Sequence, residues 1–223
     1  MSTEGTVHSG NVAGGNLLSQ GAANTLIALV LKIRALVDWC GRWASLLFVP
    51  MIVITVYDVC LRKTGKLQID LKYAAENIGL GPVFESTLLQ ETEWHLHTAL
   101  FALVLGFGVV WNTQVRVDVI REHLRFRRKA WLELLGSTFF MIPFTICVFF
   151  FAAQFAYESW AIMEISASQV GLPYRYIIKT IFTLGLLVAI LAGISVWLQS
   201  FLALFAPEGT RFELMTLEWP EDE

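Results

Sequence analysis

The amino-acid sequence predicts an all-α membrane protein with four transmembrane helices, additional interfacial amphipathic helices, and both termini on the cytoplasmic side. Residues 94–115 contain no Lys, Arg, Asp or Glu. As a helix, this stretch would extend roughly 30 Å, about the thickness of the hydrocarbon core of a bilayer. Three further apolar stretches follow the same pattern, and the chain is 56% hydrophobic and 16% charged. Water-soluble domains carry about a quarter charged residues, which favours a membrane protein.

The first 24 residues are predicted to be a flexible tail, because Gly, Ser, Asn and Thr dominate them and charges are few. They lack the basic start followed by an apolar run that is typical of a cleavable signal peptide. Residues 25–39 are apolar but include Lys32, Arg34 and Asp38. We expect an interfacial helix there, or alternatively the entrance to the first span.

The first span is predicted at about residues 40–61, with Pro50 in its middle as a candidate kink. Asp58 lies near one end of this span and Arg62 follows one helical turn later. We therefore expect an ion pair between them at the membrane boundary. The alternative is that Asp58 takes part in a proton relay.

A polar connection, residues 62–93, leads to the second span at about residues 94–113. Within the connection, residues 69–80 are expected to form a short amphipathic helix that ends at glycines. After the second span, six basic residues occur between Arg116 and Lys129. We interpret them as the positive-inside signal of a cytoplasmic loop and not as a nucleic-acid site, since the formal net charge is only −3.

The third span is predicted at about residues 134–157 and the fourth at 177–205. In the fourth span, Gly185, Ala189 and Gly193 are spaced four apart, so this stripe of small residues lies on one helix face. Such a stripe permits close approach of another helix, either from a partner protein or from the same chain. The specificity of this pattern for either arrangement is low.

These spans make residues 25–206 a single four-helix membrane domain, followed by an acidic tail at 207–223. Ten of the sixteen Lys and Arg residues fall on the side that holds both termini and the loop between the second and third spans. The positive-inside rule therefore predicts that both termini are cytoplasmic.

Residues for catalysis or metal binding are not evident in the sequence. The three cysteines follow no metal-binding or disulfide pattern, and no catalytic motif occurs. We therefore predict no enzymatic activity, no cofactor and no metal site in this chain. His95 and His97 are two residues apart and point to different faces of a helix. A haem-binding membrane anchor of an oxidoreductase, which would need histidines from a partner chain, is the alternative function; a stand-alone structural protein is another.

Three sequence segments carry a family resemblance: ETEWHLHTALFAL at 91–103, QVRVDV at 114–119 and GLPYRYIIK at 171–179. In this order and spacing, with four spans, the chain resembles the small membrane subunit of TRAP transporters, the tripartite ATP-independent periplasmic transporters. The likeness covers roughly residues 36–205 and points to the branch labelled mannitol or chloroaromatic. The family often has a histidine before the V-R-V-D run, where this chain has Gln114.

The resemblance implies a function that composition does not reveal. A periplasmic binding protein would capture an organic acid, and a large membrane subunit would move it by an elevator motion driven by the sodium gradient. The small subunit would hold the scaffold of the large subunit in the bacterial inner membrane. On this hypothesis, sodium and substrate bind to the large subunit, which agrees with the scarcity of polar groups in the four spans.

The resemblance also gives positional hypotheses for partner contacts. The large subunit would contact both ends of the second span and the small-residue stripe: Glu93, Trp94, Arg116, Asp118, Gly185, Ala189 and Gly193. A plain membrane-surface anchor is the alternative role for the span ends, and intramolecular packing is the alternative for the stripe. The periplasmic binding protein would dock on the last connection, at Gly171, Pro173, Arg175 and Lys179.

Overall fold

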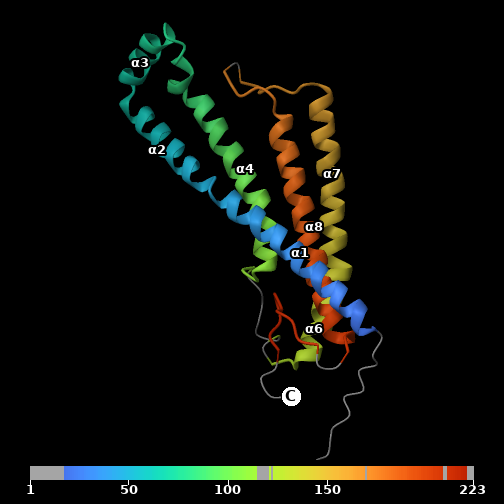
Figure 1. Ribbon diagram of the computed structural model, residues 1–223. Helices are drawn as coiled ribbons and strands as arrows, with labels where there is room; N and C mark the ends of the chain where they lie inside the picture. Colours follow the sequence, from blue (N-terminus) through green and yellow to red (C-terminus); the bar gives the residue numbers. More distant parts are fainter. Residues whose placement is uncertain (1–17, 115–120, 122, 169, 208–209, 220–223) are drawn as a thin grey trace, which may run out of the picture.

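Helices form all the regular structure in the part of the chain that the computed structural model describes, residues 18–114, 121, 123–168, 170–207 and 210–219. Four helical segments there are long and apolar enough to cross a membrane: Gln20–Thr64, Ser86–Val110, Phe126–Ala161 and Tyr176–Phe205. This confirms the prediction of an all-α fold with four helical segments long and apolar enough to span a membrane (Figure 1).

The first helix, α1 (Gln20–Ser45), begins earlier than the sequence boundary at residue 24 indicated. Ser19 explains the early start, because its hydroxyl accepts a hydrogen bond from the backbone N–H of Ala22 at 3.3 Å. Buried residues recur every seven positions along one face of α1. This face packs on α4 (Ser86–Val110) and α8 (Tyr176–Phe205). The buried residues of this face are Ala23, Val30, Val37 and Ala44.

The first span, expected at about residues 40–61, consists of two helices, and the candidate span runs from Gln20 to Thr64. A turn at Leu46 and Leu47 separates α1 from α2 (Phe48–Thr64). Pro50 lies in the first turn of α2, where a missing N–H leaves no hydrogen bond unmade. Pro50 thus lies just after a helix break at Leu46 and Leu47, within the candidate span Gln20–Thr64.

The third span is also longer than the predicted 134–157. It joins α6 (Phe126–Gly136), a short π-helix, η2 (Ser137–Met141), and α7 (Ile142–Ala161). Pro143 lies at the start of α7, directly after the π-helix, which is a usual position for a helix irregularity.

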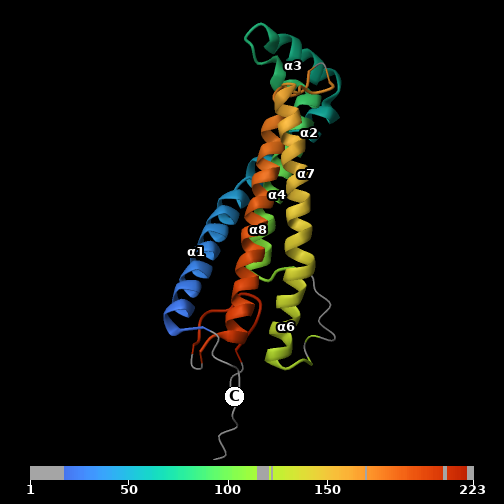
Figure 2. The same cartoon turned by 90° about the vertical axis from the view of Figure 1, so that its right-hand side faces the viewer.

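The two ends of the molecule are formed by different elements (Figures 1 and 2). At one end lie α3 (Lys66–Glu76), the short 3₁₀ helix η1 (Gly81–Phe84) and the connection between α7 and α8. We call this the α3 end. At the other, the α6 end, lie the start of α1, helix α6 and the C-terminal segment, which we define as residues 210–219.

The central contact of the bundle is between α4 and α8. A Cβ atom built on Gly185 would lie 2.5 Å from the carbonyl carbon of Ala102, so the two backbones approach as closely as glycine permits. Gly106 makes the matching approach from α4, where a Cβ atom would lie 3.0 Å from the Val188 side chain. Small residues on both helices therefore set the distance between them.

Replacing Gly185 with alanine is expected to destabilise the bundle by about 1–3 kcal/mol, because the added methyl group meets backbone atoms that cannot move aside without separating α4 from α8. Thermal unfolding in mild detergent would measure the change. Gly136→Ala is the matched control, since nothing lies within 4 Å of a Cβ atom at that helical position. The control should be neutral or stabilising by up to about 1 kcal/mol; an equal loss in both variants would contradict the packing argument.

Candidate functional site

A buried carboxylate on α4 organises the α3 end of the molecule. Glu91 is only 8% exposed, and one of its oxygens accepts a hydrogen bond from the Ser166 hydroxyl. Its other oxygen accepts the backbone N–H of Leu172 at 2.5 Å. The guanidinium of Arg175 lies 3.4 Å from the carboxylate. A single side chain of α4 thus binds three points of the α7–α8 connection, which we call the Glu91 cluster.

Aromatic and backbone contacts complete the Glu91 cluster. The Arg175 guanidinium lies 5.5 Å from the ring centroid of Trp94, in a cation–π arrangement. The backbone N–H of Arg175 donates to the carbonyl of Glu164 at 3.0 Å. Gly171 approaches so closely that a Cβ atom there would lie 2.6 Å from a Glu91 oxygen. Only glycine fits at that position with the cluster intact.

A second ion pair joins the connection to the start of α8. The Lys179 ammonium group contacts the carboxylate of Glu164 and also lies 3.6 Å from the ring centroid of Phe155 on α7. The hydrogen bond from Lys179 holds the pKa of Glu164 below its ordinary value.

The lowered pKa of Glu164 predicts a loss of stability in acid. A carboxyl group with a depressed folded-state pKa contributes stability above its unfolded-state pKa, about 4.3, and this contribution is lost as pH falls through the folded-state pKa. Wild type should therefore melt at a higher temperature than Glu164→Gln at pH 7, and the difference should disappear in acid. Melting curves in detergent from pH 7 to pH 3 test this. Exposed Glu158, changed to Gln, is the control; a pH-independent difference would contradict the linkage.

Three of the four residues predicted to dock the binding protein also make contacts within their own chain. Arg175 contacts Glu91, and Lys179 contacts Glu164. Gly171 packs beside Glu91. Pro173 is exposed at the surface. Trp94, which was assigned to a separate partner contact, belongs to the same cluster through its ring contact with Arg175. The structure thus brings two groups of predicted residues together.

The remaining residues assigned to the second-span ends differ in placement. Glu93 has a buried carboxylate oxygen, Oε1, without a hydrogen bond to the residues that the structure describes. Arg116 and Asp118 lie outside the described residues.

Asp58 on α2 is fully buried and forms an ion pair with Arg62 one turn later. Asp58 also accepts a hydrogen bond from the Ser86 hydroxyl at 2.7 Å, which connects α2 to the first residue of α4. This contact across two helices goes beyond the local ion pair that the sequence indicated.

The small-residue stripe of α8 is occupied by the chain itself. Gly185 faces Ala102 of α4, Ala189 is 3% exposed, and a Cβ atom on Gly193 would lie 3.3 Å from the methyl group of Met141. Of the two arrangements that the spacing allowed, the structure has intramolecular packing.

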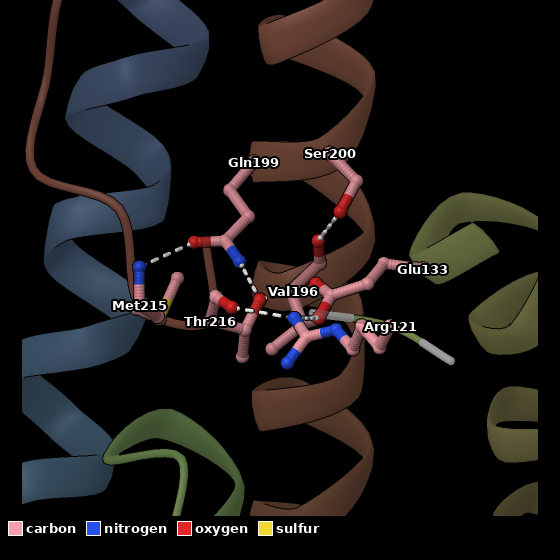
Figure 3. Close-up of polar contacts among 7 residues, drawn as sticks. All are labelled: Arg121, Glu133, Val196, Gln199, Ser200, Met215 and Thr216. Atoms are coloured by element: carbon pink, nitrogen blue, oxygen red, sulfur yellow. Dashed lines mark hydrogen bonds and ion pairs between the residues drawn. The ribbon is translucent and has the colours of Figure 1, made fainter. Parts of the chain in front are cut away.

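A buried polar network fixes the C-terminal segment at the α6 end (Figure 3). The side chain of Gln199 on α8 is fully buried; its amide nitrogen donates to the Thr216 hydroxyl, and its oxygen accepts the Met215 backbone N–H at 2.7 Å. The Thr216 hydroxyl in turn donates to Glu133 on α6. Arg121 pairs with Glu133 and donates to the Thr216 carbonyl at 2.7 Å.

Apolar and charged contacts hold the same segment on both sides of the network. The ring of Trp219 stacks on Phe126 with centroids 5.0 Å apart, and Leu217 is buried beside α6. Glu213 forms a 2.8 Å ion pair with Arg34 of α1. Residues 210–219 therefore pack against α1, α6 and α8, although composition alone indicated a separate acidic tail.

The sequence reasoning missed the residues that carry both clusters. Glu91 was visible as a carboxylate before an uncharged stretch, but nothing in the sequence identified its partners 75 to 84 residues away. Gln199 offered a clearer signal, because a glutamine within an apolar helix needs a hydrogen-bonding partner.

The histidines of α4 line two different grooves. His95 lies in a groove of about 380 Å³ between α4 and α8, and His97 lies in a groove of about 520 Å³ beside the junction of α1 and α2. They therefore do not face one another across a shared haem site. Within the described residues, no group of three or more His, Cys, Asp or Glu side chains is placed to hold a metal ion.

Comparisons of this chain with protein-family models, with curated proteins and with solved structures find no match.

Proposed function

We propose that this chain is the small membrane subunit of a TRAP-type transporter in a bacterial inner membrane. In this role it scaffolds a large elevator-type subunit, which takes up an organic acid by sodium symport after a periplasmic binding protein delivers it. Sodium and substrate are bound by the large subunit and not by this chain.

One observation carries the proposal. Two of the three segments on which the family resemblance rests lie far apart in the sequence and contact each other in the Glu91 cluster. Glu91 and Trp94 belong to the segment 91–103, while Leu172 and Arg175 belong to the segment 171–179. The contact gives the two segments one structural role, the joining of α4 to the α7–α8 connection, and this supports treating their likeness to one family as a single feature.

The arrangement of the two ends supports the orientation that goes with this function. The start of α1 and the C-terminal segment lie at the same end, as an even number of spans requires (Figure 1). Six basic residues follow the end of α4 at Val110 on that side, and three of them, Arg127, Arg128 and Lys129, lie in the first turn of α6. We place the α6 end in the cytoplasm and the α3 end in the periplasm.

The lipid-facing surface supports a scaffold role. Large apolar side chains are exposed along α2 and α7, for example Val53 and Phe144 at 62% and 71%. Such surfaces need hydrocarbon or another membrane protein to cover them. A chain that combines a rigid α4–α8 centre with wide apolar faces is suited to anchor a partner in the bilayer.

The test is affinity purification of this chain from native membranes in mild detergent, with mass spectrometry of the proteins that accompany it. A large, very apolar membrane protein in near-equal amount is expected. Reconstitution of both chains with a periplasmic binding protein that co-purifies with them should give sodium-dependent uptake of an organic acid. A flavoprotein or iron–sulfur partner, or a stable monomer, would overturn the proposal in favour of an oxidoreductase anchor or a stand-alone protein.

A further inference from the structure

One face of α4 is left uncovered beside the junction of α1 and α2. His97, Phe101, Leu105 and Gly108 recur at helical spacing along this face and form the floor of a groove of about 520 Å³. Phe48 lies on its opposite wall. Phe101 is 64% exposed there. We call this groove the His97 groove.

His97 is the unusual residue of the groove. Its side chain is exposed, its ring stacks on Phe101 with centroids 6.3 Å apart, and it has no hydrogen bond to any residue that the structure describes. It lies three residues after Trp94, so it is about 5 Å further into the membrane than that boundary residue. A polar ring at this depth is costly unless another group forms a hydrogen bond with it.

The neighbouring histidine provides an internal comparison. The Nδ1 atom of His95 lies 2.6 Å from the carbonyl oxygen of Glu91, one turn earlier in the same helix. The ring of His95 also packs on Trp94, with centroids 4.0 Å apart. The chain therefore satisfies His95 by itself and leaves His97 to be satisfied from outside.

We propose that the His97 groove is the docking surface for a transmembrane helix of the large membrane subunit, and that a polar side chain of that helix forms a hydrogen bond with His97. This inference rests on the proposed function, because it assigns a surface to the partner named there. Two features favour a helix over a lipid chain as the occupant. A hydrocarbon chain would leave the imidazole without a partner, and the small residues Ser45 and Gly108 permit a second backbone to approach closely.

The expected partner helix is defined by this chemistry. It presents apolar side chains to Phe101 and Leu105, and a Ser, Thr, Asn, Gln or acidic side chain to His97. Its smallest residues face Gly108, where a larger side chain on either helix would hold the two apart.

Site-directed photo-crosslinking in membranes that contain both subunits tests the surface. A photoreactive p-benzoylphenylalanine replaces Phe101 in one variant and Phe144 in the control, because Phe144 is 71% exposed on α7, away from the groove. We expect the variant at 101 to form a covalent adduct with the large subunit, identified by mass spectrometry. The variant at 144 should label lipid.

Substitution of the histidine tests the hydrogen bond. His97→Leu should lower the amount of large subunit that co-purifies with this chain by about threefold to tenfold, the effect expected for one hydrogen bond between helices in a membrane. His97→Gln, which keeps a donor and an acceptor, should retain most of the binding. Phe144→Leu, on α7 away from the groove, should have no effect.

The outcomes separate this inference from the proposed function. If wild type co-purifies with the large subunit, but position 101 labels only lipid or a second copy of this chain, the docking surface is wrong and the function stands. Equal labelling by large subunit at 101 and 144, or unchanged co-purification in His97→Leu, would also overturn the inference. If wild type brings down no large subunit, both proposals fail, and that measurement requires no variant.

Discussion

Replacement of Glu91 by alanine should release the connection between α7 and α8 and destabilise the protein by about 2–4 kcal/mol. The substitution removes the carboxylate that accepts hydrogen bonds from the Ser166 hydroxyl, the Leu172 N–H and the Arg175 guanidinium. These three donors then have no acceptor in the cluster. Loss of one member of a buried ion pair usually costs about 3–5 kcal/mol, and the partial exposure of Arg175 reduces this cost. Thermal unfolding in detergent measures the effect.

Trypsin gives a local readout of the same change. Cleavage after Arg175 should accelerate in Glu91→Ala, because a detached connection can enter the protease. Glu158→Ala is the matched control: this glutamate is exposed and accepts a hydrogen bond from Gln154 one turn earlier in the same helix. If the two variants melt alike and are cleaved at the rate of wild type, Glu91 does not organise this end of the molecule.

Gln199→Leu is expected to lower stability by about 2–3 kcal/mol, although leucine is similar in size and more compatible with an apolar helix. The buried Met215 N–H loses its acceptor, the Gln199 side-chain oxygen. The Thr216 hydroxyl loses the hydrogen bond that the Gln199 amide nitrogen donates to it. A buried donor left without a partner costs about 1–3 kcal/mol. The C-terminal segment should then separate from α8, with faster tryptic cleavage at Arg211.

The control for this prediction is the same substitution in a different environment. Gln154→Leu on α7 replaces an exposed glutamine whose amide contacts only Glu158 among the described residues, and it adds an apolar group to a surface expected to face lipid. It should be neutral or stabilising. Stability losses of equal size in the two variants would show that the network around Thr216 contributes nothing of its own.

The sequence predicted the number of spans because hydrocarbon imposes a length and a composition that a single helix must satisfy alone. It also indicated that the small-residue stripe at Gly185 contacts another helix, either of a partner protein or of the same chain. It placed helix ends less well, because the capping hydrogen bond of Ser19 and the missing N–H of Pro50 are local features that apolar runs do not reveal.

The functional clusters could not be predicted for a different reason. Glu91 and Glu133 bind groups that are distant in the sequence, and a carboxylate carries no information about which donor it will meet. Composition was misleading for the C-terminal segment, because its acidic character concealed the apolar residues Leu217 and Trp219 that pack against α6.

The position of the C-terminal segment has a consequence for biosynthesis. Residues 210–219 are synthesised after helix α8, so the buried side chain of Gln199 exists before its partners Met215 and Thr216 do. The α6 end therefore cannot mature step by step as each helix is inserted. Its assembly waits until residues 210–219 have been synthesised and have returned to α8, where Met215 and Thr216 meet Gln199.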